Sequence, residues 1–315
     1  MAFKGKTLID LGLSSSDRPL TRIEGLAVDS RDVKKGYLFI ALPGSQFHGA
    51  EFAKLAFKQG AIAILTDNDG ARTAGKEIKK FNVVACILDD PRGALARAAA
   101  IFYGGQPEVA VAVTGTNGKT SVASFCRQIW ADTGFNAINL GTTGVEGYWT
   151  ASLNHTTPEP ILLHRILSEA KSAGVTHVAM EASSHGLDQK RLEGVPVQVA
   201  GFTTFSQDHL DYHSTFEKYF AAKLTLFSRV LSPDGTAVIN IDDPKGSELK
   251  QLCLNQNQKV ISVGHTASDL QLLGQRFYAT GQEILFSWKG QTHQIKVPLV
   301  GCLLYTSPSP RDLRK

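Results

Sequence analysis

Residues 114–120 read TGTNGKT, and they stand between an apolar run at 109–113 and a stretch with helical spacing. Glycines allow a tight turn that brings backbone N–H groups against anionic oxygens, and the positive end of the following helix faces the same place. Lys119 is then expected to reach the β- and γ-phosphates of a nucleotide, and Thr120 to bind Mg²⁺. The usual pattern has its first glycine at position 113, where this chain has Val113. The sequence therefore predicts an ATP-binding loop made of Thr114, Gly115, Thr116, Asn117, Gly118, Lys119 and Thr120.

The 315 residues are enough for about two domains, and their composition is that of a soluble globular protein. No apolar run approaches the roughly 20 residues that a membrane span requires, and the N-terminus lacks the apolar core of a signal peptide. We therefore expect a cytoplasmic protein. The net charge of +4, without a block of Lys or Arg, suits an anionic small molecule as well as nucleic acid, so charge does not decide the function. The four cysteines lack disulfide or metal-ligand spacing, and Cys86 and Cys126 are expected in the core.

Segments typical of strands and helices alternate along the whole chain. In the first hundred residues, strands are expected at 37–42, 61–65 and 83–88 and helices at 50–59 and 91–102, closed by Gly and Pro at 103–107. We expect an N-terminal α/β domain over residues 1–106. From there, strands at 109–113, 137–140, 177–180, 197–203 and 237–241 are separated by helix-length intervals, which predicts a mostly parallel sheet over residues 107–301. Alternating short strands within 258–299 predict an antiparallel appendage.

Polar clusters follow three of these strands, at 114–120, 181–186 and 206–211. Ligands bind at the carboxyl ends of strands in parallel sheets, so the three clusters predict one site. Glu181 ends a buried strand, where a carboxylate is costly unless it is paired or binds a metal. We interpret Glu181 as a Mg²⁺ ligand, with capping of the next helix as the alternative. His209, between two aspartates, is a second candidate, with a plain surface histidine as the alternative.

Lys223 lies on the apolar stripe of a helix predicted at 216–230, because Tyr219, Phe220, Leu226 and Phe227 stand three and four residues away. Desolvation lowers the pKa of an amine and leaves more of it neutral, the form that reacts with CO₂ to give a carbamate. The alternative, which the pattern alone favours, is a lysine whose stem packs on the core while its ammonium reaches solvent.

Further polar residues lie near the same edge of the sheet. Thr156 and Thr157 precede a helix and are suited to capping it. Ser183, Gln189 and Arg191 offer neutral donors and one cation, which suit a sugar, a phosphate or a carboxylate. The neighbouring Ser and His at 184–185 lack the G-x-S-x-G turn of a hydrolase, so nucleophilic catalysis is not expected.

Several motifs along the chain belong together. They are VDSRDVKKG at 28–36 with LFIA at 38–41, GTNGKTS at 115–121, HTTP at 155–158, EASSHGL at 181–187 with Gln189 and Arg191, DHLDYH at 208–213 and AAK at 221–223. With these motifs the chain resembles the Mur ligase family over residues 22–301. The Val28-Asp29-Ser30-Arg31 element and the 208–213 element distinguish this family from folylpolyglutamate synthetase, a relative with a similar phosphate loop. His155 departs from the family, because many members have Asn there.

The resemblance implies a role for each matching residue. Lys119, Lys223 and His209 would be catalytic. The metal ligands would be Thr120, Glu181, His209 and Lys223 as its carbamate. The UDP end of the substrate would be bound by Ser30, Ser45, Gln46 and Phe47, and its muramoyl-dipeptide by Thr156, Thr157, Ser183, Gln189 and Arg191. Val28 and His155 would also contact the substrate.

The implied activity is that of an ATP-dependent amide ligase of peptidoglycan synthesis, and thus of cell-wall growth, cell shape and cell division. ATP would phosphorylate the D-glutamyl carboxylate of UDP-N-acetylmuramoyl-L-alanyl-D-glutamate, and the amine of a diamino acid would attack the acyl phosphate. The diamino acid would be meso-diaminopimelate or lysine, of which we expect diaminopimelate. ATP, Mg²⁺ and a CO₂-derived carbamate are the implied cofactors, and we expect a monomer without a nucleic-acid partner. The alternatives are a folylpolyglutamate synthetase-like ligase and a non-catalytic nucleotide-binding fragment.

The end of the chain differs from the family. Other members continue from the strand at 299–301 into a Rossmann-like C-terminal domain that binds the incoming amino acid. Here residues 302–315 contain Ser-Pro pairs that do not sustain a helix or an inner strand. We therefore expect residues 302–315 to be non-native, the central domain to be incomplete, the C-terminal domain to be missing, and turnover to be low or absent.

Overall fold

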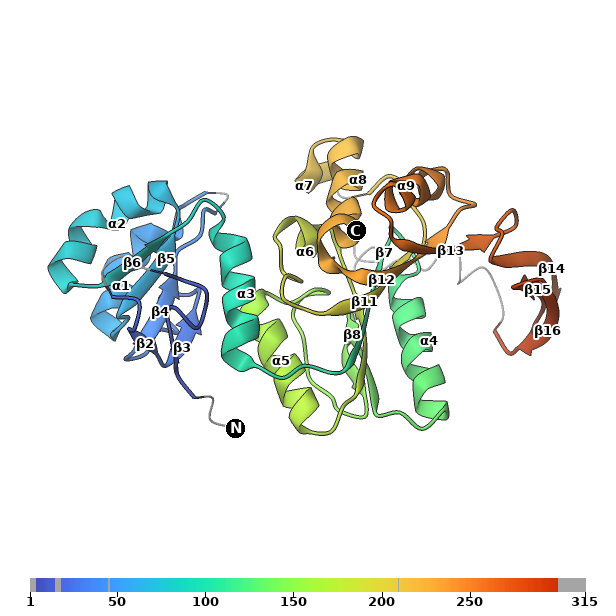
Figure 1. The fold of residues 1–315 in the computed structure, drawn as a ribbon, viewed down its shortest axis with the longest axis horizontal. Coiled ribbons are helices and arrows are strands. Elements are labelled where there is room, and N and C mark those ends of the chain that lie inside the picture. The colour runs from blue at the N-terminus through green and yellow to red at the C-terminus, as the bar shows by residue number, and fades with distance from the viewer. Residues whose placement is uncertain (1–3, 15–17, 45, 209, 300–315) are drawn as a thin grey trace. The chain divides into compact units, whose positions relative to one another are not determined.

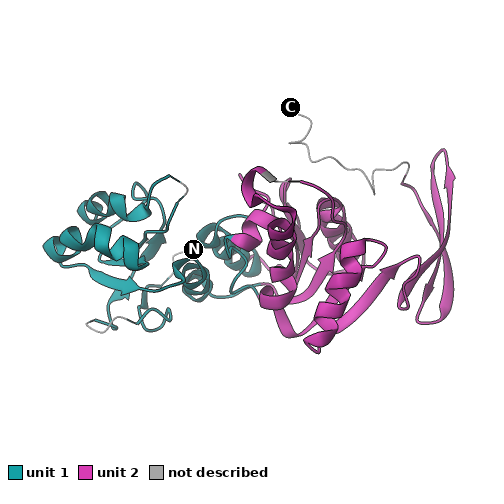
Figure 2. Cartoon of the chain, turned by 90° about the horizontal axis from the view of Figure 1, so that it is seen from above, with its two compact units in different colours: residues 1–106, 158–172, 189–195 teal, residues 107–157, 173–188, 196–315 magenta. Residues whose placement is uncertain are grey.

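The computed structural model describes residues 4–14, 18–44, 46–208 and 210–299. These residues form two compact units, and each unit is built from separate stretches of chain (Figure 2). Unit 1 comprises residues 1–106, 158–172 and 189–195, and unit 2 comprises 107–157, 173–188 and 196–315. The expected non-native tail at 302–315 lies outside the described residues. No helix within the described ranges is long and apolar enough to cross a membrane.

Unit 1 contains a four-stranded parallel sheet in the order β3-β4-β5-β6 (Figure 1). Its strands are β3 (Gly25–Ala27), β4 (Tyr37–Ile40), β5 (Ala63–Thr66) and β6 (Val84–Ile87), beside a small antiparallel pair, β1 (Lys6–Thr7) and β2 (Arg22–Ile23). Its helices are η1 (Gly49–Phe52), α1 (Ala53–Gln59), α2 (Asn68–Phe81), α3 (Pro91–Tyr103) and α5 (Pro160–Ser172). The predicted strands and helices of this region are all present, and the sequence prediction missed α2.

Both faces of the unit 1 sheet are buried. Leu38 and Ile40 of β4 pack into one apolar cluster together with Leu95 of α3, whereas Phe39 between them packs into a second cluster with Phe57 of α1. Successive side chains of a strand point to opposite faces, so a sheet covered on both sides requires a continuous apolar run. This requirement explains the run at 37–42, which does not alternate with polar residues.

Unit 2 is a ten-stranded sheet in the order β16-β15-β14-β13-β12-β11-β7-β10-β8-β9. Strands β8, β10, β7, β11 and β12 are parallel, as predicted, and β13 continues them in the same direction. The strands are β7 (Val109–Thr114), β8 (Ala137–Gly141), β9 (Gly144–Gly147), β10 (His177–Glu181), β11 (Val197–Phe202), β12 (Leu231–Asn240), β13 (Lys259–Gly264), β14 (Leu270–Tyr278), β15 (Gly281–Trp288) and β16 (Gln291–Val297). The helices are α4 (Lys119–Asp132), α6 (Ser184–Asp188), α7 (Leu210–His213), α8 (Phe216–Thr225), the π-helix η2 (Leu226–Val230) and α9 (Pro244–Asn255).

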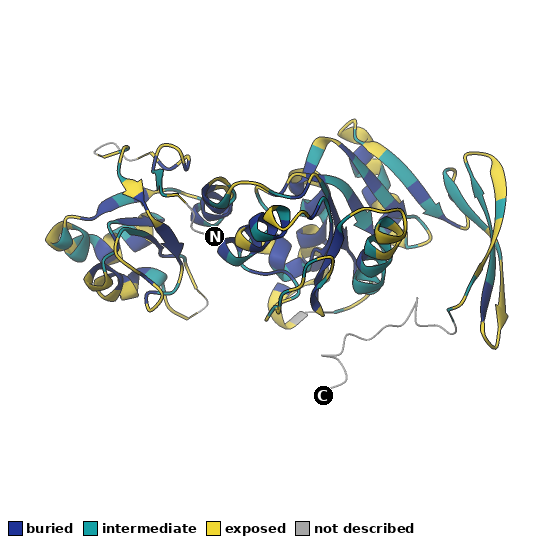
Figure 3. Cartoon of the chain, turned by 90° about the horizontal axis from the view of Figure 1, so that it is seen from below, coloured by how far each residue is buried: buried dark blue, intermediate teal, exposed yellow. Residues whose placement is uncertain are grey.

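The antiparallel appendage is confirmed for β14, β15 and β16, which form a meander of mostly half-buried and exposed residues (Figure 3). The expectation that it begins at residue 258 is wrong. β13 pairs with β12 in parallel and therefore extends the main sheet. Cys86 and Cys253 are buried and Cys126 is half-buried, and these three cysteines are free thiols.

We predict that acid destabilises the wild-type chain more than its His164→Gln variant. His164 of α5 is 1 % exposed, and its ring Nε2 lies 2.9 Å from the carbonyl oxygen of Glu193. Burial lowers the pKa of His164 to about 4, against the opposing effect of this hydrogen bond. The unfolded chain keeps a pKa near 6.5. The unfolded state therefore takes up the proton first, and up to about 3 kcal/mol of stability is lost as the pH falls from 6.5 towards 4.

Urea unfolding at pH 7 and pH 4.5 measures this difference. Gln at position 164 keeps a side-chain amide donor but does not titrate in this range. If the variant lost as much unfolding free energy on acidification as the wild type, His164 would not be the responsible group.

Candidate functional site

The predicted phosphate loop lies between β7 and α4, as the sequence indicated. Gly118 is the N-cap of α4 with φ of 86°, and Gly115 has φ of 144°. A side chain at position 115 would collide with the hydroxyl of Thr203 and approach the backbone of Thr204 within 3.0 Å. Gly115 is therefore required both by its backbone conformation and by the space around it.

The segment after β11 holds the loop in place. The N–H of Thr116 donates to the carbonyl of Thr204 at 2.6 Å, and the N–H of Asn117 donates to the Thr204 hydroxyl at 3.2 Å. The hydroxyl of Thr203 donates back to the carbonyl of Asn117 at 2.5 Å. The N–H groups of Thr116 and Asn117 are therefore already hydrogen-bonded within the protein. The groups suited to bind an anion are the N–H groups of the first turn of α4, which have no carbonyl partner within the helix.

Two lysine ammonium groups meet at one carbonyl of the loop. Nζ of Lys119 donates to the carbonyls of Gly115 and Thr116 at 3.0 and 2.9 Å, and Nζ of Lys223 donates to the same Gly115 carbonyl at 2.8 Å. Lys223 is 1 % exposed and lies 4.4 Å from the ring centroid of Tyr219. The interpretation that the sequence pattern alone favoured, in which the Lys223 ammonium reaches solvent, is therefore wrong. Burial, and next the charge of Lys119, hold the pKa of Lys223 well below its usual value.

Glu181 is the last residue of β10, which pairs with β7. In this pairing Glu181 lies opposite Val113. The side chain is 2 % exposed. One carboxylate oxygen accepts from the N–H of Thr142 at 2.8 Å, and the other accepts from the Thr142 hydroxyl at 3.3 Å. Gly141 leaves room for this carboxylate, since a Cβ there would collide with it. Glu181 does not cap α6; the Ser183 hydroxyl accepts the N–H of Gly186 instead, at 3.1 Å.

Sequence reasoning missed Thr142. It follows β8 at the carboxyl edge of the sheet, so the rule that selected the other three polar clusters would have found it. Its hydroxyl also lies 3.1 Å from that of Thr156.

The hydroxyl of Thr157 donates to the Glu181 carbonyl at 2.8 Å and accepts from the N–H and the hydroxyl of Ser183, both at 3.0 Å. Thr156, Thr157 and Ser183 are thus gathered around Glu181, whereas His155 is exposed. The carboxylate of Glu159 caps α5 by accepting the N–H groups of Ile161 and Leu162, the role that the sequence assigned to Thr156 and Thr157.

The predicted metal ligands fit Mg²⁺ in their chemistry. The Glu181 carboxylate, sheltered from solvent with Thr142 as its donor, and the Thr120 hydroxyl at the start of α4 are the hard oxygen donors that Mg²⁺ prefers. Within the described ranges, no group of three or more His, Cys, Asp or Glu side chains is assembled for a metal. His209 lies outside the described residues.

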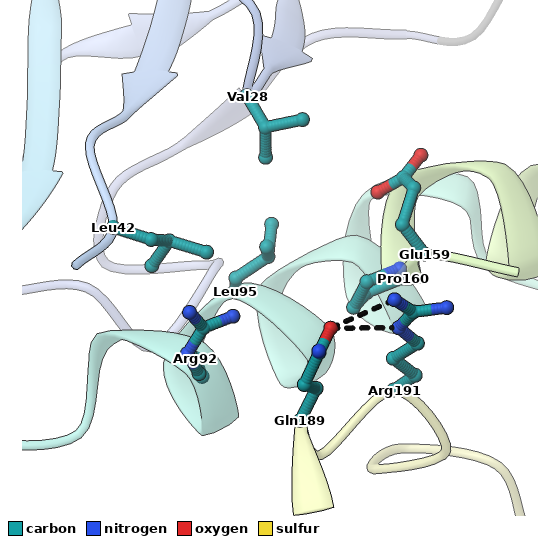
Figure 4. Close-up of a pocket in the computed structure, with 8 residues that line it drawn as sticks. All are labelled: Val28, Leu42, Arg92, Leu95, Glu159, Pro160, Gln189 and Arg191. Carbon is teal, nitrogen blue, oxygen red and sulfur yellow. Dashed lines mark hydrogen bonds between the residues drawn. The ribbon is translucent and has the colours of Figure 1, made fainter. Parts of the chain in front are cut away.

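Unit 1 contains a pocket of about 110 Å³ (Figure 4). It brings together three residues predicted to bind substrate, namely Val28, Gln189 and Arg191. Oε1 of Gln189 accepts hydrogen bonds from Nε and Nη2 of Arg191 at 3.2 and 2.7 Å. Gln189 therefore fixes the orientation of the Arg191 guanidinium. The other lining residues, which the sequence analysis did not select, are Leu42, Arg92, Leu95, Glu159 and Pro160.

Of the predicted UDP-binding residues, Ser30, Gln46 and Phe47 do not line this pocket. Ser30 is buried, Gln46 is exposed and Phe47 is 60 % exposed. Ser45 lies outside the described residues. Arg92 lines the pocket and also contacts the chain near Gln46. Its Nη2 donates to the carbonyl of Pro43, three residues before Gln46, at 2.6 Å.

Comparison with known families decides the relationship. Residues 113–304 match the Mur ligase middle domain, and residues 22–103 match the domain described as Mur ligase family, catalytic domain. The chain belongs to the Mur ligase family. The resemblance inferred from the motifs is thereby confirmed, and so is the α/β fold with a mostly parallel sheet.

Among curated Mur ligases, the chain is 43 % identical over 291 residues to the UDP-N-acetylmuramoyl-L-alanyl-D-glutamate--2,6-diaminopimelate ligase of Zymomonas mobilis, covering 92 % of this chain and 58 % of that protein. It is 45 % identical over 280 residues to the protein of the same name from Brucella melitensis, covering 89 % and 56 %. The chain thus spans little more than half the length of these relatives.

A solved structure of a ligase of this name superposes with a TM-score of 0.80 at 27 % identity, covering 94 % of this chain and 60 % of the other. A Mycobacterium tuberculosis folylpolyglutamate synthase complexed with ADP superposes with a TM-score of 0.54 at 18 % identity, over 67 % of this chain and 54 % of the other. The second likeness concerns the fold alone.

We predict that Gly115→Ala lowers the free energy of unfolding by about 1–3 kcal/mol more than Gly134→Ala does. Both glycines have positive φ, but Gly134 has open space around its Cα, so it controls for backbone strain without the collision. Urea unfolding monitored by circular dichroism measures both variants. Equal losses would mean that Thr203 and Thr204 yield to the added methyl group.

Proposed function

We propose that this chain provides the ATP-binding and acceptor-binding parts of an ATP-dependent amide ligase of peptidoglycan synthesis. The acceptor would be UDP-N-acetylmuramoyl-L-alanyl-D-glutamate and the added amino acid diaminopimelate, the compounds in the names of the relatives that are 43 and 45 % identical. The observation that carries the proposal is the meeting of Lys119 and Lys223 at the Gly115 carbonyl, which directly follows the central strand β7, where Val113 pairs with Glu181.

The chain would divide its ligands between two domains. We assign the UDP portion of the acceptor to residues 1–106, with Val28, Ser30, Ser45, Gln46 and Phe47, and ATP to residues 107–301. Gln189 and Arg191 would bind an anionic group of the acceptor, which their fixed donors in the unit 1 pocket favour. His155, Thr156, Thr157 and Ser183 would contact the remainder of the muramoyl-dipeptide.

The residues of this chain would act mainly by charge and position. Lys119 and the first N–H groups of α4 would neutralise the γ-phosphate while an oxygen of the D-glutamyl carboxylate attacks its phosphorus and ADP leaves. The amine of diaminopimelate would then attack the acyl carbon, form the amide and release phosphate. Thr120, Glu181, His209 and carbamylated Lys223 would hold Mg²⁺, which would supply Lewis-acid stabilisation of the phosphoryl charge. This sequence of steps requires no Ser or Cys nucleophile.

The surroundings of Lys223 support the proposal that it is carbamylated. Burial favours the neutral amine, whose lone pair attacks the carbon of CO₂ while a proton leaves to solvent. The product would be an anion close to the proposed phosphate loop, because Nζ of Lys223 contacts the Gly115 carbonyl. A carbamate would therefore replace a buried neutral amine with a carboxylate-like metal ligand.

We predict that Lys223 becomes labelled when the protein is equilibrated with ¹³C-bicarbonate at pH 8. Carbon NMR should detect a carbamate in the wild-type chain and in Lys218→Gln, an exposed lysine of the same helix. The signal should be absent from Lys223→Gln. Retention of the signal in Lys223→Gln, or its absence from the wild type, would contradict the assignment.

Binding and turnover are best measured separately. We predict that the chain binds ATP and that Lys119→Met weakens this binding at least about tenfold, because an ammonium–phosphate contact is lost. Isothermal titration with a non-hydrolysable ATP analogue gives the affinity. The same affinity in both proteins would remove Lys119 from the site, and no binding by the wild type would overturn the ATP assignment.

The acceptor distinguishes the alternatives. Binding of UDP-N-acetylmuramoyl-L-alanyl-D-glutamate but not of a folate supports the proposal, and the reverse supports a folylpolyglutamate synthetase-like ligase. Phosphate release that depends on both the acceptor and diaminopimelate would establish the complete reaction. Nucleotide binding without acceptor binding would indicate a non-catalytic nucleotide-binding fragment.

A further inference from the structure

Residues 189–195 form a loop, here called the pocket loop, that carries Gln189 and Arg191 at the unit 1 pocket. Two contacts with other parts of unit 1 anchor its far end. The Glu193 carbonyl lies 2.9 Å from Nε2 of His164, and the Gly194 carbonyl accepts from Nε2 of Gln106 at 2.9 Å. The near end, where the pocket residues lie, has a different anchor.

Lys190, between Gln189 and Arg191, has a backbone φ of 56°. A residue other than glycine pays about 1 kcal/mol or more for this left-handed conformation, so the surroundings must stabilise it. The conformation matters for the pocket because it sets the directions of the two flanking side chains. In it, Gln189 accepts two hydrogen bonds from the Arg191 guanidinium.

The compensating contact is an ion pair with Asp90. Nζ of Lys190 lies 2.6 Å from Oδ2 of Asp90, although the two residues are 100 positions apart in sequence. Oδ1 of Asp90 accepts the N–H of Gly93 at 3.1 Å and so caps α3. Burial raises the pKa of the Asp90 carboxyl. The hydrogen bonds from Lys190 and from the N–H of Gly93 lower it, as do, more weakly, the charges of Lys190 and Arg97, and the pKa lies below its usual value. Asp90 is thus fixed by a helix and in turn fixes the loop.

We propose that the Asp90–Lys190 ion pair is a positioning device that holds Arg191 in the orientation needed to bind the anionic acceptor. The inference rests on the proposed function, in which Arg191 contacts that acceptor. Asp90 and Lys190 themselves do not line the pocket. They act through the backbone at position 190.

The sign of one effect separates positioning from plain electrostatics. Asp90→Asn removes a negative charge near the pocket, which by Coulomb attraction alone would tighten the binding of an anion. Loss of the anchor for Lys190 would weaken binding instead. Asn also caps helices well, so α3 keeps its N-terminal hydrogen bond.

We predict that Asp90→Asn weakens binding of UDP-N-acetylmuramoyl-L-alanyl-D-glutamate about tenfold in isothermal titration. Lys190→Gly, which favours the left-handed backbone, should weaken binding less than Lys190→Ala, which lacks both the ion pair and that preference. The double variant Asp90→Asn/Lys190→Gln should be no weaker than its single variants, because both remove the same contact.

The matched control is Lys76→Gln, which removes one exposed positive charge from α2 in the same unit. It should leave the affinity unchanged, and all variants should bind the ATP analogue as the wild type does. Unchanged or tighter acceptor binding by Asp90→Asn, with normal binding by the wild type, would overturn this inference alone. Failure of the wild type to bind the acceptor would overturn it together with the proposed function.

Discussion

The site depends on the register of three parallel strands. β10 and β11 flank β7, with Glu181 opposite Val113 and Phe202 opposite Thr114. Because all three strands run in the same direction, their carboxyl ends coincide, and the segments that follow them are forced together. A shift of one residue in the β10–β7 pairing would turn Glu181 to the other face of the sheet, and a shift in the β11–β7 pairing would move Thr203 away from Asn117. The hydrogen bonds between the phosphate loop and residues 203–204 can form only in the observed register of β11 on β7.

Much of the fold was predictable because it depends on local patterns. Apolar runs of strand length separated by helix-length intervals identified the α/β make-up of residues 1–106 and the parallel sheet of unit 2. Glycines near Lys119 identified the phosphate loop. The apolar stripe around Lys223 also placed that lysine correctly, but helical spacing alone could not say whether its ammonium reached water. That answer depends on Tyr219 and on the Gly115 carbonyl, the latter 108 positions away in sequence.

Features that depend on contacts between distant residues were not predictable in the same way. The place of Thr142 after β8 could have been predicted, but its contact with Glu181 could not. The two residues are 39 positions apart, and no spacing rule connects a hydroxyl in one turn with a carboxylate at the end of another strand. Arg92 was read only as part of a helix, because its contact with the Pro43 carbonyl exists only after that helix has packed on its sheet. The start of the antiparallel meander was misplaced for a related reason, since alternation in sequence does not reveal the direction of the neighbouring strand.

The interleaved make-up of unit 1 has a consequence for how the chain is made. Its apolar cluster includes Ile161, and its anchored segment ends at residue 195, whereas residues 107–157 and 173–188 belong to unit 2. A chain emerging from the ribosome can pair the strands of the unit 1 sheet early, but that unit lacks part of its core until about two hundred residues have been synthesised. Unit 1 therefore cannot complete its packing until residues 107–157 and 173–188 of unit 2 have also been synthesised. Unit 2 in turn waits for strands β11, β12 and β13, which are made after the last segment of unit 1.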